Sequence, residues 1–129
     1  MNKMNSIQFG EGNFIRAFVD YCIQLLNEKT EFNGKVSVIQ PIEKGKIEIL
    51  KNQKGQFHLF IEGIFNNKNI RDIKVISCID KVINPYKEFE SFLELAKDKN
   101  LNFFFSNTTE AGIEYNKNDL KSMKLTISF

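Results

Sequence analysis

A strand, a glycine turn and a helix follow one another without a break near the start of the chain, and this order constrains the fold most. Two glycines one residue apart, Gly10 and Gly12, separate a short apolar run near 5–9 from a helical pattern near 13–28. Gly10 permits a tight turn. Gly12 has no Cβ, so the backbone there can approach phosphate oxygens at the helix N-terminus. The pattern predicts the start of a βαβ unit with a pyrophosphate site.

The helix after the glycines has a broad apolar face. Its apolar residues recur at helical spacing, and we expect them to pack on a sheet: Phe14, Ala17, Phe18, Tyr21, Cys22, Leu25 and Leu26. Because Ile15 replaces the third glycine of the usual dinucleotide fingerprint, this helix has to support the prediction. Arg16, one turn into the helix, is either a phosphate ligand or a solvated arginine, and the pattern leaves both open.

The remaining elements predict an α/β fold with a mainly parallel sheet, Rossmann-like and interrupted by a hairpin-type insertion. Nearly continuous apolar runs predict buried parallel strands at 36–39 and 101–105. A short helix is expected at 46–52. The runs 57–61 and 70–83, joined by a polar turn at 66–69, predict the hairpin. Asn84 and Pro85 predict a helix start, with a buried stripe formed by Tyr86, Phe89, Phe92, Leu93 and Ala96.

Polar residues that follow the predicted strands are candidate ligands. Gln40 and Glu43 come after the second strand, where a dinucleotide-binding domain places a group that binds the ribose hydroxyls. A polar loop after Phe105 either lines a nicotinamide or substrate pocket or forms a turn with a helix cap: Asn107, Thr108, Thr109 and Glu110. Since no arginine cluster is present to bind a 2′-phosphate, NAD is favoured over NADP. His58 lies in an alternating strand, which favours a surface role over catalysis.

Charge and hydropathy exclude several classes of protein. The net charge is +2 without long runs of either sign, so nucleic acid and membrane surfaces are not expected partners. No apolar run reaches the roughly 20 residues that span a bilayer, and a soluble cytoplasmic protein is expected. Cys22 and Cys78 have no metal or disulfide spacing and predict buried free thiols. No metal site, nucleophile triad or carboxylate pair is evident.

Four separated segments, 8–18, 38–45, 75–79 with 83–86, and 106–113, closely resemble the tagaturonate reductases of the mannitol dehydrogenase family, which comprises long-chain polyol and sugar-acid dehydrogenases. The resemblance implies NADH-dependent reduction of tagaturonate, a small sugar acid, to altronate in hexuronate breakdown. It also implies that Gly10, Gly12, Asn13, Phe14 and Arg16 surround the cofactor pyrophosphate. Ser77 and the loop 107–110 would approach the nicotinamide.

The resemblance covers the chain up to about Asp119. We therefore expect residues 1–119 to form the amino-terminal part of a NAD-binding Rossmann domain, with 120–129 a divergent tail. Family members run to several hundred residues and carry their catalytic lysine in a downstream helical domain, so this chain is expected to be truncated and inactive alone. The alternative from the sequence is a non-catalytic dinucleotide-binding or interaction module. The oligomeric state is left open.

Overall fold

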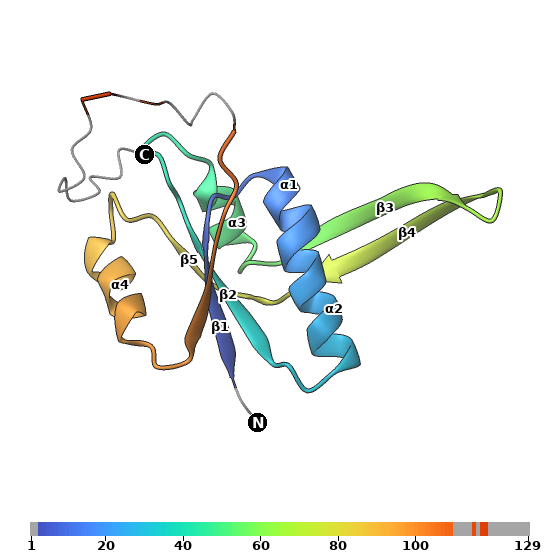
Figure 1. Ribbon diagram of the computed structural model, residues 1–129, viewed down its shortest axis with the longest axis horizontal. Helices are drawn as coiled ribbons and strands as arrows, with labels where there is room; N and C mark the ends of the chain where they lie inside the picture. Colours follow the sequence, from blue (N-terminus) through green and yellow to red (C-terminus); the bar gives the residue numbers. More distant parts are fainter. Residues whose placement is uncertain (1–2, 110–114, 116, 119–129) are drawn as a thin grey trace.

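Four parallel strands form the centre of the fold. The computed structural model describes residues 3–109, 115 and 117–118. The central sheet consists of β1 (Met4–Phe9), β2 (Gly34–Ile39), β5 (Ile79–Ile83) and β6 (Leu101–Ser106), in the order β5-β2-β1-β6 (Figure 1). Each neighbouring pair is parallel. The predicted α/β class and the positions of the three predicted strands of this sheet are confirmed. The strand at 101–105, expected to be buried, is largely exposed because it forms the edge strand β6.

One long helix follows β1 and runs along the sheet. It consists of α1 (Asn13–Ile15), the π-helical segment η1 (Arg16–Asp20) and α2 (Tyr21–Lys29), which form a continuous ribbon in Figure 1. The side chain of Asn27 joins its end to β2: Oδ1 accepts from the Gly34 N–H at 2.6 Å and Nδ2 donates to the Gly34 carbonyl at 2.8 Å. These two hydrogen bonds fix the end of α2 to the start of β2.

The predicted buried face of this helix is wrong in phase. Ile15, Asp20 and Ile23 are buried, whereas Phe14 is 67% exposed and Phe18 is 60% exposed. Ile15 and Asp20 are five residues apart, which is the repeat of a π turn, so the side chains beyond the turn are rotated from their positions in a regular 3.6-residue helix. Cys22, expected to be buried, is exposed and lines an apolar cavity with Phe18 and Phe103 beside edge strand β6, while Cys78 is buried as predicted.

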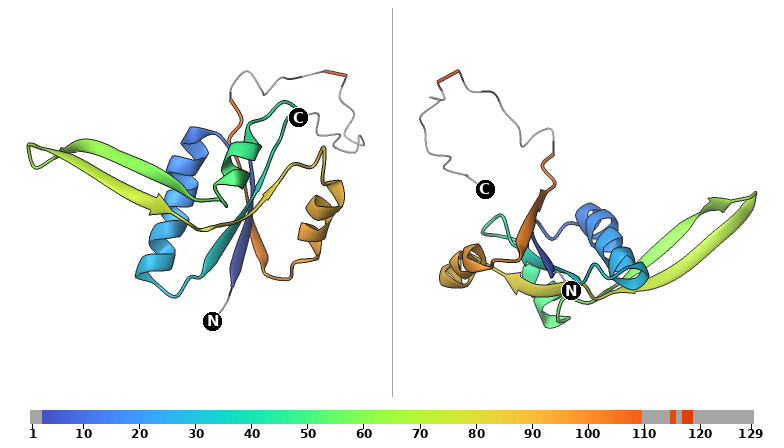
Figure 2. Two further views of the ribbon diagram at one scale, coloured as in Figure 1. Left: turned by 180° about the vertical axis from the view of Figure 1, so that it is seen from behind. Right: turned by 60° about the horizontal axis from the view of Figure 1, so that its bottom comes forward.

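The connection from β2 to β5 contains a short helix and a projecting hairpin. The helix, α3 (Ile47–Asn52), confirms the prediction for 46–52. The hairpin pairs β3 (Phe57–Phe65) with β4 (Lys68–Ile76) and extends away from the rest of the fold in both views of Figure 2. Its turn places Asn66 and Asn67 at positive φ, which asparagine tolerates well. The predicted second arm was too long, because residues 79–83 belong to the central sheet as β5.

The connection from β5 to β6 corrects the predicted helix start at Asn84. Asn84 Oδ1 accepts from the Tyr86 N–H at 3.1 Å, and its carbonyl accepts from the Glu88 N–H at 2.8 Å. These bonds close a turn, so α4 (Phe89–Glu94) and the 3-10 segment η2 (Leu95–Lys97) begin later than predicted. The later start rotates the helix. Leu95 is buried and Phe92 half-buried, but the other residues of the expected stripe are exposed: Tyr86, Phe89, Leu93 and Ala96.

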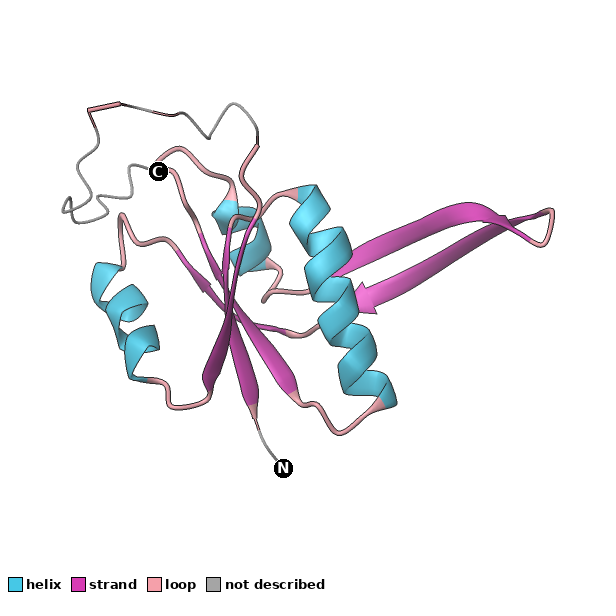
Figure 3. Cartoon of the chain, in the orientation of Figure 1, coloured by secondary structure: helices cyan, strands magenta, loops and turns pink. Residues whose placement is uncertain are grey.

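Helices lie on both faces of the sheet (Figure 3). On one face Val36 and Val38 join residues of α2, α3 and the β4–β5 region in one cluster. On the other, Ile7, Ile39 and Ile83 pack with Leu95. Each isoleucine or valine buried in this way contributes roughly 1.5–3 kcal/mol. The inner strands β1 and β2 are buried, whereas edge strand β6 is largely exposed. No helix among the described residues could cross a membrane.

Candidate functional site

The carboxyl end of the sheet gathers most of the predicted ligands. Phe9 of β1 is paired with Ile39 of β2 and with Ser106 of β6. The residues that follow these strands are therefore neighbours, and they include Gly10, Gln40 and Asn107. The Gly10 N–H donates to the Ile39 carbonyl at 2.9 Å, which continues the pairing into the turn. Ligands bind at this edge in open parallel α/β sheets.

The two glycines of the turn are used differently. Gly10 has a φ of +116°, a conformation that other residues adopt only with strain. Gly12 has an ordinary φ of −64° and is the N-cap of the long helix. A Cβ added to Gly12 would meet nothing within 4 Å. The fold itself therefore does not require glycine at position 12, and the open space above it is available to a ligand.

A cavity of about 410 Å³ opens beside this turn. It is lined by Glu11, Gly12, Asn13, Arg16, Lys46, Ile49, Leu50 and Gln53. Two cationic side chains and one carboxylate thus border it, which favours an anion. Glu11 Oε1 also accepts from the Lys46 backbone N–H at 3.0 Å and fixes the loop after β2 against the glycine turn. Sequence reasoning missed Glu11 and Lys46, although Glu11 lies between the two glycines.

Arg16 is held in place at the edge of this cavity. Its Nη2 donates to Asn13 Oδ1 at 2.8 Å, and its guanidinium lies over the Phe57 ring, 5.0 Å from the centroid. Nε of Arg16 is buried without a hydrogen-bond partner among the described residues. The contacts with Asn13 and Phe57 reduce the freedom of a long side chain, so less entropy is lost when it binds an anion. Phe14, by contrast, points to solvent and stacks with Phe18.

Gln40 organises the loop after β2 from the inside. It is 1% exposed. Its Nε2 donates to the Glu43 carbonyl at 3.1 Å, and its Oε1 accepts from the Ile47 N–H at 3.3 Å. A Cβ at Gly45 would overlap the Gln40 side chain, so Gly45 lets the loop close around it. Gln40 would reach a ribose only after these bonds break, whereas Glu43 is exposed in the same loop.

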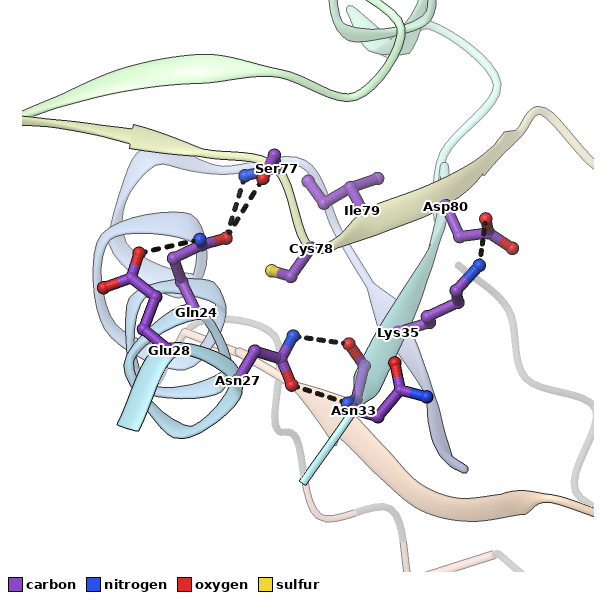
Figure 4. Close-up of a pocket in the computed structure, with 10 residues that line it drawn as sticks. Gln24, Asn27, Glu28, Asn33, Lys35, Ser77, Cys78, Ile79 and Asp80 are labelled. Atoms are coloured by element: carbon purple, nitrogen blue, oxygen red, sulfur yellow. Dashed lines mark hydrogen bonds and ion pairs between the residues drawn. The ribbon is translucent and has the colours of Figure 1, made fainter. Parts of the chain in front are cut away.

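Ser77 does not share an edge with the glycine turn. It precedes β5, and Ile79 of β5 is paired with Val36 near the start of β2, so Ser77 lies at the amino end of the parallel sheet. There it borders a second cavity of about 330 Å³, shown in Figure 4, and its N–H donates to Gln24 Oε1 at 3.0 Å. The nicotinamide contact implied for Ser77 is not supported, because the direction of β5 places it at the opposite end from Gly10.

The last predicted ligands follow β6. Asn107, Thr108 and Thr109 are exposed beyond the strand, at the same edge as Gly10. Glu110 lies outside the described residues. Among the residues that the structure describes, no group of three or more His, Cys, Asp or Glu side chains could hold a metal ion.

A buried carboxyl, that of Asp20, lies near the Gln8 side chain. Asp20 and Gln8 are both 0% exposed. Burial raises the pKa of Asp20 from its usual 3.8 to about 7, while the polar Gln8 side chain and the positive charge of Arg16 oppose that rise. The Cys78 thiol contacts the Asp20 carbonyl at 3.4 Å, and burial, with the Asp20 charge, raises the pKa of Cys78 to about 12.

Residues 4–128 match the family model described as the mannitol dehydrogenase Rossmann domain. The chain belongs to the mannitol dehydrogenase family. Curated relatives of this family are named altronate oxidoreductase. Those of Phocaeicola vulgatus and Yersinia enterocolitica are 45% and 46% identical to the chain over 109 and 114 residues. These alignments cover 84% and 88% of this chain but 23% and 24% of the relatives, so the chain spans about a quarter of their length.

Two solved structures with similar folds support the fold. Pseudomonas fluorescens mannitol 2-dehydrogenase, in a ternary complex with NAD and D-mannitol, superposes with a TM-score of 0.67 at 15% identity, covering 82% of this chain and 22% of that one. A D-sorbitol dehydrogenase in substrate-free form gives 0.68 at 17% identity, covering 91% and 26%. At these identities the likeness establishes the Rossmann fold, as the sequence predicted.

Proposed function

We propose that this chain is the dinucleotide-binding part of a NAD-dependent oxidoreductase that reduces tagaturonate to altronate in hexuronate breakdown. The names of the curated relatives support the reaction and the sugar-acid substrate. The observation that carries the proposal is Gly12: the fold has no need of a glycine there, yet a Cβ at this position would occupy the space next to the helix N-terminus. A backbone that must approach a pyrophosphate explains both facts.

The chain's own residues would bind and orient the cofactor. The first N–H groups of a helix have no partner within the helix, and Gly12, as the N-cap, leaves them uncovered for phosphate oxygens. Arg16 and Lys46 border the same cavity and would balance the phosphate charge. Glu43 would bind the ribose, and the exposed residues after β6 would lie toward the nicotinamide. When bound, NADH supplies the hydride that the ketone carbon of the substrate accepts.

Proton transfer to the new hydroxyl would come from elsewhere in a longer protein. The relatives are about four times as long as the part that matches, so they have room for a substrate domain with the acid–base group. We propose that this chain alone binds the cofactor in the cytoplasm of the cell but does not turn over substrate. Its substrate partner is a small sugar acid that reaches the site only in the longer protein.

Calorimetric titration of the 129-residue chain with NADH tests the proposal. Gly12→Val places a branched side chain in the open space, and we expect saturable binding by the wild type and none by the variant. Gly63→Val is the matched control, because a Cβ at Gly63 also meets nothing within 4 Å but lies on the hairpin. A folded wild type that binds no NADH, or a Gly12→Val variant that binds as well as wild type, would overturn the proposal.

A further inference from the structure

Three buried acceptor oxygens near the glycine turn have no donor. They are Oδ1 and Oδ2 of Asp20 and Oε1 of Gln8, and none has a hydrogen-bond partner among the described residues. Both side chains are fully buried, Gln8 on β1 and Asp20 at the end of the π-helical segment η1. Unpaired buried acceptors are costly, so an arrangement that keeps several of them together needs an explanation.

Gln8 connects this buried group to the turn that would bind the pyrophosphate. Its Nε2 donates to the Gly10 carbonyl at 3.1 Å. Gly10 is the residue held at a φ of +116°, so Gln8 contacts the part of the turn with the least common backbone geometry. A change in the orientation of the Gln8 amide would therefore weaken or break the hydrogen bond to the Gly10 carbonyl.

We propose that Asp20 is a positioning residue for the glycine turn: it acts through Gln8 on the Gly10 backbone, and the turn is set for a dinucleotide when Asp20 carries a proton. The consequence for binding rests on the proposed function. The role of Asp20 in setting the turn is independent of the proposed function.

A proton on Asp20 would supply the donor that these three oxygens lack. A protonated carboxyl donates one hydrogen bond. The Gln8 side chain faces Asp20, and its unpartnered Oε1 can accept that bond. With that bond made, Gln8 Nε2 remains directed at the Gly10 carbonyl. An ionised Asp20 offers only acceptors, so it repels Oε1 and competes with Gly10 for the Nε2 hydrogens. Ionisation therefore loosens the turn.

The charges around Asp20 also favour anion binding when Asp20 is protonated. The groups that face it are Gln8 from β1, Arg16 from its own helix, and the Cys78 thiol from the segment before β5. An ionised Asp20 offsets part of the field of Arg16, which borders the candidate phosphate cavity. A pKa of about 7 places this change in the physiological range. By linkage, a bound pyrophosphate would in turn raise the pKa of Asp20 and draw in a proton.

Nuclear magnetic resonance tests the role of Asp20 without any cofactor. The carboxyl carbon of Asp20 and the amide signal of Gly10 would be followed in the wild-type chain from about pH 5.5 to 8.5, the range around the expected titration. We expect the two signals to share one midpoint, and the Gly10 titration to vanish in Asp20→Asn. In Gln8→Met, Asp20 should still titrate while Gly10 no longer follows. A Gly10 signal that is flat in wild type, or that titrates equally in Asp20→Asn, would overturn the proposal.

Two controls exclude other groups. Asp80→Asn makes the same chemical change at an exposed aspartate that pairs with Lys35, and it should leave the Gly10 titration intact. His58→Gln removes the single histidine of the chain, which follows Phe57 on β3. If the Gly10 titration disappears in His58→Gln instead of Asp20→Asn, the histidine and not Asp20 sets the turn.

NADH calorimetry then tests the consequence for binding. We expect affinity to fall about fivefold from pH 6 to pH 8, at the lower end of coupling between sites, with proton uptake on binding. Asp20→Asn should bind with little dependence on pH. Wild-type binding that does not change with pH would refute the coupling of Asp20 to the cofactor. If NADH fails to bind at every pH while Gly10 still follows Asp20, the proposed function falls and the positioning role of Asp20 stands.

Discussion

Replacing Asp20 by asparagine should change how the stability of the fold depends on pH. Burial raises the pKa of this carboxyl from 3.8 to about 7, a difference of about three pKa units at about 1.4 kcal/mol each. The folded state of the wild type therefore binds a proton more tightly than the unfolded chain. This contribution is fully present below pH 3.8 and is lost as the pH rises to about 7. The total loss is about 4 kcal/mol, a large part of the stability of a small domain.

Asp20→Asn cannot ionise, so its stability should not fall in this range. Urea unfolding followed by circular dichroism at several pH values measures the free energy of unfolding of both proteins. Between about pH 4.5 and 8 the variant should gain about 3 kcal/mol on the wild type. Other carboxyls have pKa values lowered by lysine or amide neighbours, such as Glu28, Glu88 and Asp98, and their stabilisation is lost only as the pH falls below the ordinary range. Subtracting the two curves removes that shared term.

The result that would refute this reasoning is a pair of parallel pH curves. Parallel curves would mean that Asp20 ionises as easily in the folded state as in the unfolded chain, for example because water reaches it. Asp80→Asn serves as the matched control, since Asp80 is exposed and its curve should run parallel to that of the wild type.

Three further predictions concern the glycine turn, Arg16 and the open edge of the sheet. Gly10→Ala should lower the free energy of unfolding by about 1–3 kcal/mol, because Gly10 has a positive φ. Gly12→Ala should change the free energy of unfolding by less than about 0.5 kcal/mol. Equal changes in urea unfolding of the two variants would contradict this. Arg16→Ala should weaken NADH binding by at least about tenfold in calorimetry, and an unchanged affinity would remove Arg16 from the site. Edge strand β6 exposes Phe103 and Phe104, so we expect self-association that Phe104→Lys reduces in light scattering; a monodisperse wild-type monomer would contradict this.

Much of the fold could be predicted because the sheet depends on local patterns. Val36, Val38 and Ile39 are nearly continuous apolar residues, as a strand covered on both faces requires, and all three are buried. Gly10 likewise lies in the turn that its place in the pattern predicts, and it has a φ of +116°. Both signals lie within a few residues of the feature that they specify.

The errors arose where a local pattern has two structural solutions. Asn84 can cap a helix or close a turn with the same side-chain oxygen, and here it closes a turn. Phe14 and Phe18 have the spacing of a buried stripe, but both are exposed, and Phe18 lies beside edge strand β6, where no further described strand covers it. Neither outcome could be decided without the elements that pack against these residues.

The candidate site was predictable at the turn and less so around it. Gly12 and Arg16, which the pattern places at the turn, border the same cavity. Gln40 faces inward because Gly45 lets the loop close on it, and Ser77 lies at the other end of the sheet because β5 runs parallel to β2. Both outcomes depend on how distant parts of the chain connect. Residue type alone does not encode that connection.

The pairing of β1 with β6 has a consequence for the order of folding. β1 is the first strand to be synthesised and β6 the last described one, and the side-chain bond between Asn5 and Asp98 joins residues 93 positions apart. Contacts over such separations form slowly, because closing a long loop costs entropy before the contact is made. During translation β1 can pair with β2 early, but its other edge stays open until β6 emerges. The edge beside Gly10 is therefore completed late, and a nascent chain would be unable to bind its cofactor fully before nearly all of these residues have been made.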